Sequence, residues 1–189
     1  MKKIIIIVLA LALIGAGVWY FALRPTEREG ADTGEMGSAP PLDLTKLTEY
    51  QNETYAISFL YPSAYALTEA EVGTGNHRVT LTGRAAAGVP VGTGAITIDI
   101  YPRRGSEPLG EWLQKGNANF NLSSGTRTAT VIAESEAQVF HWSEAGLEAD
   151  TIAIVNGDYF YVGTVRYSAI TDQVYKDFPI VIGTLSLGE

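Results

Sequence analysis

An uncharged run of 20 residues near the amino end, Ile4 to Leu23, constrains this chain more than any other feature of its sequence. Apart from two glycines, every residue in the run is hydrophobic. A helix of that length is about 30 Å long, which matches the hydrocarbon thickness of a bilayer. An aromatic triplet, Trp19 to Phe21, lies near its end, and aromatic residues are typical of membrane interfaces. We therefore predict an uncleaved transmembrane signal-anchor over residues 1–23, with residues 4–23 in the membrane.

The alternative is a cleaved secretory signal, whose apolar region usually spans about 7 to 15 residues and ends in small side chains. Lys2 and Lys3 precede the run, whereas basic and acidic residues are interleaved beyond it. Basic residues tend to stay on the cytoplasmic side of a membrane span. The pattern predicts a single-pass protein of the cell membrane, with a cytoplasmic amino terminus and an extracytoplasmic carboxy-terminal domain.

Residues 24–46 are rich in Gly, Pro, Thr, Glu and Asp and contain few large apolar residues. Such a segment cannot bury enough apolar surface to offset the entropy of ordering, so we predict a flexible linker. Residues 1–46 carry five basic and five acidic residues, whereas residues 47–189 carry eight and sixteen. The net charge of −8 therefore belongs to the predicted domain, 47–189. We expect no nucleic-acid partner, because binding phosphates takes clustered Lys and Arg.

Strand-like periodicity dominates the domain. The clearest strand is Ala95 to Tyr101, whose three isoleucines alternate with Thr97, Asp99 and Tyr101. Asn156-Gly157 joins two β-rich runs and predicts a hairpin, because both turn positions of the commonest type favour positive φ. The other predicted strands are Tyr55–Tyr61, an extended segment at Tyr65–Leu67, His77–Thr82, Thr126–Glu134, Ala137–Trp142, Glu148–Val155 and Asp158–Tyr167.

Two segments have helical spacing. The first is predicted to start around Ser106 and Pro108, with Ser106 as its cap, and to extend as far as Phe120. The second covers Thr171–Leu185, where Pro179 predicts a kink or a break. Residues 83–94 are small and Gly-rich, which indicates a loop. The order of elements predicts an α+β fold: an antiparallel β-sheet with helices packed on it, preceded by one transmembrane helix.

The segment Tyr55 to Pro62, YAISFLYP, resembles the opening of PsbP-like domains, a family named after an extrinsic protein of photosystem II. Pro108 to Leu113, PLGEWL, is similar to the start of a helix in that family, and Tyr175 to Leu185 is similar to its closing helix. The sequence departs from the pattern at Tyr65, near which the family usually carries a Trp. The resemblance implies an α/β/α sandwich. It also implies that the chain is related to extrinsic subunits, assembly factors and envelope proteins, most of which have no catalytic role.

Tyr159, Tyr161 and Tyr167 share one face of the last predicted strand, and Gly163 leaves a gap between them. This tyrosine face is our candidate for binding a ring-shaped or peptide ligand. The alternative is that the rings pack beneath a helix. Next to Pro102, Arg103 and Arg104 are candidates for anion binding or for surface ion pairs.

His141, Ser143 and the following Asp150 allow a Ser-His-Asp triad to be drawn, although Ser143 lacks a nucleophile elbow. The favoured interpretation of His141 is a strand residue bonded to a polar neighbour, and His77 is expected to be exposed at a strand start. A metal would need both histidines with Asp99 or Glu148, and no local spacing supports that. The chain has no cysteine. We predict no catalytic residue, no cofactor and no metal.

The sequence therefore predicts a noncatalytic, membrane-anchored module that binds a protein complex of the cell envelope or assists its assembly. The alternative is a domain that binds a small molecule or an envelope polymer at the tyrosine face. An envelope hydrolase is the third possibility.

Overall fold

The structure, a computed structural model, describes residues 46–83, 94–115, 127–144 and 146–188. The predicted anchor, nearly all of the linker, most of the Gly-rich loop and Phe120 lie outside these ranges. Within them, no helix is both long enough and apolar enough to cross a membrane.

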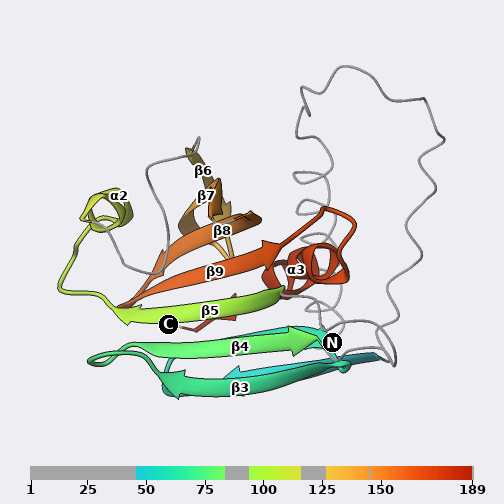
Figure 1. The fold of residues 1–189 in the computed structure, drawn as a ribbon. Coiled ribbons are helices and arrows are strands. Elements are labelled where there is room, and N and C mark those ends of the chain that lie inside the picture. The colour runs from blue at the N-terminus through green and yellow to red at the C-terminus, as the bar shows by residue number, and fades with distance from the viewer. Residues whose placement is uncertain (1–45, 84–93, 116–126, 145, 189) are drawn as a thin grey trace.

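A seven-stranded antiparallel sheet forms the body of the domain, and a three-stranded antiparallel sheet packs against it (Figure 1). The seven strands, in spatial order, are β3 (Tyr65–Glu71), β4 (His77–Gly83), β5 (Ala95–Pro102), β9 (Tyr159–Tyr167), β8 (Leu147–Asn156), β7 (Ser135–Glu144) and β6 (Arg127–Ile132). The small sheet has the order β1 (Leu47–Asn52), β2 (Ile57–Pro62) and β10 (Ser186–Leu187). The predicted antiparallel sheet is thus confirmed, and its strands divide between two sheets.

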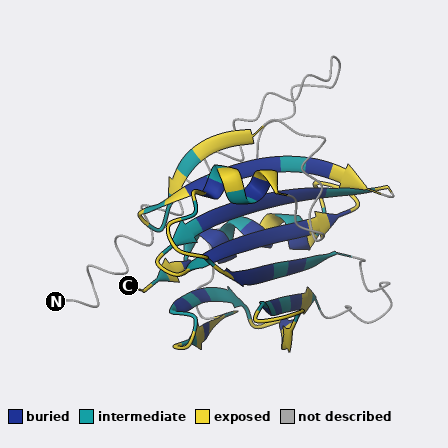
Figure 2. Cartoon of the chain, turned by 90° about the vertical axis from the view of Figure 1, so that its left-hand side faces the viewer, coloured by how far each residue is buried: buried dark blue, intermediate teal, exposed yellow. Residues whose placement is uncertain are grey.

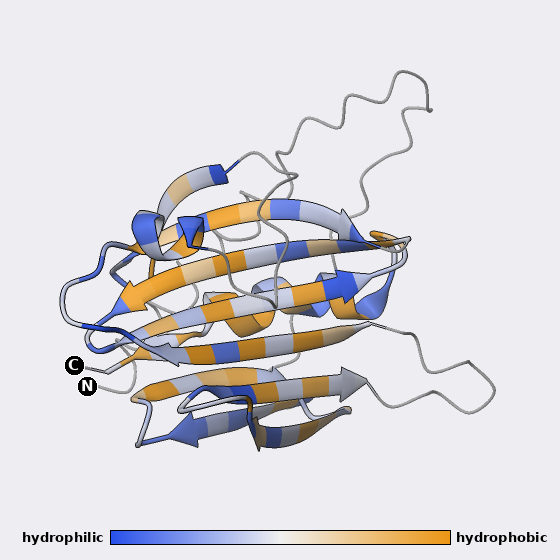
Figure 3. Cartoon of the chain, turned by 60° about the vertical axis from the view of Figure 1, so that its left-hand side comes forward, coloured by the Kyte–Doolittle hydropathy of each residue, from blue (hydrophilic) through white to orange (hydrophobic). Residues whose placement is uncertain are grey.

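Two helices cover opposite faces of the large sheet. The longer helix, α3 (Gln173–Gly183), packs on one face together with the small sheet, and Phe178 is among the residues it buries there. The short helix α2 (Leu109–Gln114) packs on the other face through Leu109 and Leu113. Hydrophobic and hydrophilic residues alternate along several strands in Figure 3, and most residues of β8 and β9, in the middle of the sheet, are buried (Figure 2). The core therefore has two parts, because the large sheet separates one cluster of buried apolar residues from the other.

The β8–β9 hairpin forms where it was predicted but turns one residue later. Asn156 still pairs with Tyr159, so Gly157 and Asp158 are the two turn residues. Of these only Gly157 has a positive φ, 52°, which is the pattern of a type II′ turn. The Asn156 side chain is then free to donate a hydrogen bond to the Gly188 carbonyl at 2.9 Å, which holds the chain next to β10.

Both helix predictions need correction. α3 has no break, because the helix continues through Pro179 as far as Gly183. Thr184 ends it, and its hydroxyl donates to the Ile180 carbonyl at 2.8 Å and accepts from the backbone N–H of Leu60 at 2.9 Å. Ser106 does not cap α2: it lies in a turn, and Pro108 occupies the capping position without a side-chain hydrogen bond.

Candidate functional site

His141 and Asp150 lie directly opposite each other on β7 and β8. The His141 Nδ1 atom is 3.0 Å from Asp150 Oδ1, and the Tyr167 hydroxyl donates to Asp150 Oδ2 at 3.1 Å. The Asp150 carboxylate is fully buried. Buried carboxylates are stable only when hydrogen bonded, so both bonds are part of what holds this end of the sheet together. The structure thus brings together two members of the predicted triad.

The second ring nitrogen of His141 contacts a residue that the triad did not include. Nε2 is 2.9 Å from Glu148 Oε2, whereas a serine nucleophile would need its hydroxyl at that nitrogen. Ser143 is the cross-strand partner of Glu148. The sequence held a signal for Glu148, because it is two residues before Asp150 and therefore on the same face of its strand. The geometry agrees with the favoured interpretation, in which His141 is bonded to polar neighbours.

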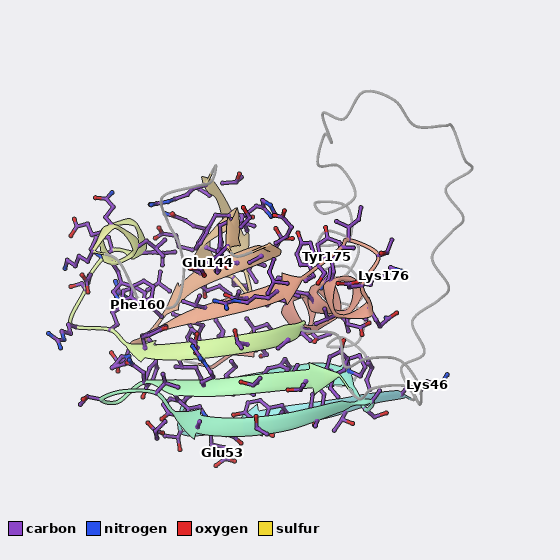
Figure 4. The ribbon with its side chains drawn as sticks, in the orientation of Figure 1. Lys46, Glu53, Glu144, Phe160, Tyr175 and Lys176 are labelled. Carbon is purple, nitrogen blue, oxygen red and sulfur yellow. The ribbon has the colours of Figure 1, made fainter. Side chains whose placement is uncertain are left out.

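The tyrosine face is mostly covered. Tyr161 and Tyr167 are buried, and the Tyr161 hydroxyl donates to the Tyr55 carbonyl at 2.9 Å. Burial raises the pKa of Tyr161 to about 12. Tyr159 is half-buried, and its ring lies edge-on to the Tyr55 ring at 5.6 Å. The gap predicted at Gly163 is filled, because a Cβ atom there would lie 2.8 Å from the side chain of Ile182 on α3. Figure 4 shows α3, with Tyr175 near its start, beside β9.

His77 was expected to be exposed, and this is wrong: it is 7% exposed, because the Tyr55 ring stacks on it at 4.6 Å. Its ring nitrogens lie 2.8 Å from Glu69 Oε2 and 3.2 Å from Glu71 Oε1, both on the neighbouring strand β3. Tyr50 of the small sheet also donates to Glu69 Oε2, at 3.0 Å. The cluster therefore fastens the small sheet to the β3 edge of the large one.

The Arg103 side chain holds a loop. Its Nε atom donates to the Glu107 carbonyl at 2.9 Å, and its guanidinium lies 5.9 Å from the centre of the Phe160 ring. Phe160 in turn stacks on Trp112 of α2, with 4.4 Å between the ring centres. Neither anion binding nor a surface ion pair is needed to explain Arg103, since its bonds tie the loop to the core.

Five threonines form a single row across the large sheet. Each is the direct cross-strand partner of the next: Thr68, Thr80, Thr97, Thr164 and Thr151. The last two are buried and lie 3.1 Å apart, and Trp142 Nε1 donates to Thr151 Oγ1 at 2.9 Å. The first three lie on a face of β3, β4 and β5 whose end next to α2 is covered, because Tyr101 packs on Trp112 there. Apart from Asp99, the remaining described residues of that face are exposed or half-exposed. We call this the open face. It consists of Ala66, Thr68, Ala70, Arg78, Thr80, Thr82, Ala95 and Thr97, all exposed or half-exposed.

A hollow of about 200 Å³ lies beside β1, β2 and β10, and Asn52, Ser58 and Ser186 are among the residues that line it. That volume is below the roughly 300 Å³ at which ligand pockets usually begin. Within the same residues, no three His, Asp or Glu side chains are grouped to hold a metal ion.

The topology, with helices on both faces of a large antiparallel sheet, defines a PsbP-like fold. The solution structure of cyanobacterial PsbP (CyanoP) from Synechocystis sp. PCC 6803 is similar over 82% of this chain and 100% of that one, with a TM-score of 0.53 and 11% sequence identity. A crystal structure from Bacteroides thetaiotaomicron VPI-5482 is similar over 76% of this chain and 49% of that one, with a TM-score of 0.51 and 14% identity. The fold predicted from the resemblance to PsbP-like domains is therefore confirmed.

These similarities are much clearer in the structures than in the sequences, which are 11% and 14% identical to this chain. No protein-family profile matches the chain. No curated protein matches it either. Identities of 11% and 14% establish a shared fold and nothing about activity, because one fold carries many functions.

Proposed function

We propose that this chain is a noncatalytic module, held in the cell membrane by residues 4–23, whose extracytoplasmic domain binds an envelope protein complex or assists its assembly. The observation that best supports the proposal is how the interior uses its polar side chains. In the described part of the chain, every buried side-chain nitrogen and oxygen has a hydrogen-bond partner. Buried Asp150 is bonded to His141 and Tyr167 on the neighbouring strands, so we assign function to the surface and not to this pair.

The open face is the surface that we assign to the envelope partner. Its side chains are short, apart from Arg78, which is bound through two hydrogen bonds to Asp99 at 2.5 and 2.9 Å. Short side chains on a sheet let a second protein approach the backbone closely.

The test is site-specific photo-crosslinking of the full anchored chain in its native membrane. A crosslinker at Thr80, in the middle of the open face, should capture the same envelope protein in repeated experiments. Thr97→Arg, which places a long charged side chain beside it, should abolish the capture. A crosslinker at Ser168, exposed on a different surface, is the matched control. If Thr80 captures no reproducible partner, or captures the same proteins as Ser168, the proposal fails.

The two alternatives have tests of their own. A ligand site on the tyrosine face requires that Tyr161→Ala abolish binding and leave the melting temperature nearly unchanged. Since Tyr161 is only 2% exposed, we expect a large loss of stability instead. A hydrolase that uses the triad requires His141, so full activity of a His141→Ala variant on an envelope substrate would eliminate that mechanism.

A further inference from the structure

Strand β6 ends the large sheet opposite to β3, and only one of its edges is paired. β7 bonds to it along its whole length, from Arg127 opposite Phe140 to Ile132 opposite Ser135. On the other edge, no backbone or side-chain group of the described chain bonds to it. The strand stands at the margin of the molecule in Figure 1, and Figure 2 shows it mostly exposed. Such an edge is a template for adding another strand.

The chemistry of β6 favours strand addition. Between Thr128 and Ile132 the strand carries no charge, no proline and no bulge, which are the usual devices that protect an edge. Val131 is 69% exposed, and Ile170, at 63%, is the only other exposed large hydrophobic residue in the described part of the chain. The β3 edge differs, because Glu69 and Glu71 point from it toward the small sheet.

The charges at the two ends of β6 point to a second copy of this chain as the occupant. Arg127 begins the strand and Glu134 lies in the turn just beyond its end, and both are exposed. When two β6 strands pair antiparallel, each Arg127 comes to the end of the pair where the other copy has Glu134. A two-fold interface is self-complementary in this way, so one opposite-charge contact occurs twice.

The symmetry also limits the register. A two-fold axis perpendicular to the sheet keeps the side chains of both copies on the same face as before. An odd-numbered residue can therefore lie opposite only an odd-numbered residue, and an even-numbered residue opposite only an even-numbered one. Centring the pair on Thr130 sets Thr130 opposite itself and Val131 opposite Ala129 of the second copy. Arg127 then lies opposite Ala133 of the second copy, next to Glu134. We propose that β6 pairs in this register with β6 of a second copy, joining two large sheets into one.

The contact is small, since about five residues pair on each strand. It falls below the roughly 1,200 Å² of a stable interface, so the pairing is weak between freely diffusing molecules. Two copies anchored in one bilayer meet at a much higher effective concentration, and this compensates for weak affinity. The experiment therefore uses the full chain in lipid vesicles.

A single cysteine tests the register directly, because the chain has none of its own. Opposite residues of an antiparallel pair have Cα atoms about 4.5 to 5.5 Å apart, within the range of about 4.4 to 6.8 Å that a disulfide accepts. Under mild oxidation, Thr130→Cys should form a disulfide-linked dimer at least tenfold faster than Thr68→Cys, which is exposed on the β3 edge. Ala129→Cys and Val131→Cys should crosslink faster when mixed than either does alone. Equal rates for Thr130→Cys and Thr68→Cys would overturn the proposal.

A second variant tests the pairing without a covalent bond. Thr130→Lys places two ammonium groups against each other at the axis. Fluorescence energy transfer between donor-labelled and acceptor-labelled copies in the same vesicles should therefore fall to the level seen when the two are in separate vesicles. Arg127→Glu should weaken the transfer, and Arg127→Glu combined with Glu134→Arg should restore it. Unchanged transfer in Thr130→Lys refutes the pairing, as does a Thr130 crosslink to a different protein. Capture of the envelope partner from Thr80 is unaffected by these outcomes, so the two proposals fail separately.

Discussion

The buried chain of hydrogen bonds from Trp142 through Thr151 to Thr164 makes a quantitative prediction possible. Trp142 and Thr151 are 2% and 0% exposed, and the indole N–H has the Thr151 hydroxyl as its acceptor at 2.9 Å. Thr151→Val keeps the shape of the side chain but removes that oxygen. The indole donor and the Thr164 hydroxyl then both lose a partner in a place that water cannot reach.

The expected cost follows from these two losses. A buried donor left without an acceptor costs about 1 to 3 kcal/mol. The Thr164 hydroxyl can rotate toward another acceptor, so its loss adds little, and the additional methyl group of valine returns part of the cost. We expect Thr151→Val to lower the free energy of unfolding by about 2 kcal/mol, or the melting temperature by roughly 4 to 8 °C for a domain of this size.

Urea unfolding of the full chain in mild detergent, followed by tryptophan fluorescence and circular dichroism, measures the change. Thr151→Ser is the matched control, since it keeps the hydroxyl and loses only a methyl group. Trp142→Phe supplies the second arm of a double-mutant cycle: without an indole N–H, Thr151→Val should cost about 1 to 2 kcal/mol less. If Thr151→Val is as stable as the native chain, or the cycle shows no coupling, the hydrogen bond does not stabilise the sheet as we argue.

Three further predictions concern single positions. In the β6–β7 turn, Ala133 and Glu134 both have positive φ, 50° and 61°, so Glu134→Gly should relieve about 1 kcal/mol of strain and raise the melting temperature; no change would mean that the turn relaxes in solution. Burial raises the pKa of the Tyr161 hydroxyl to about 12, whereas in the unfolded chain this group ionises near pH 10. The folded domain should therefore lose stability between pH 10 and 12, and Tyr161→Phe should make that loss smaller in unfolding curves measured at alkaline pH. Phe178→Ala empties the space between α3 and Gly163 and should cost about 3 to 5 kcal/mol in denaturant unfolding, far more than any exposed substitution on the same helix.

The sequence predicts strands best where side chains alternate cleanly. The isoleucines at positions 96, 98 and 100 are all buried on one face of β5, as period-two alternation requires. Prediction from alternation fails for β1, because Tyr50 is the only fully buried residue of that strand. It also fails for β10, which is only two residues long. Such strands form because a neighbouring strand holds them, and a neighbour is not visible in a local pattern.

The candidate site shows a similar division. Cross-strand order predicted that His141 would be near Asp150, and the shared face of the three tyrosines follows from spacing. What covers a face depends on tertiary packing. The side chain of Ile182 fills the space at Gly163, and the ring of Tyr55 covers His77, although each of these partners is distant in sequence. Burial of a histidine is therefore the feature that sequence spacing predicts least well.

The two edges of the large sheet show why one sheet can present surfaces of opposite character. At β3, Glu69 and Glu71 are bound by His77 and the small sheet, so a strand added there would have to compete with those bonds and accommodate two carboxylates. At β6 no described residue forms a comparable bond that has to be displaced, and Val131 loses its exposure to water when a strand is added. A charged side chain on β6 should therefore protect that edge from strand addition: Val131→Glu should abolish pairing between copies. Glu69→Val and Glu71→Val on β3 should loosen the small sheet, as hydrogen exchange of β1 would report, before they create a new pairing edge.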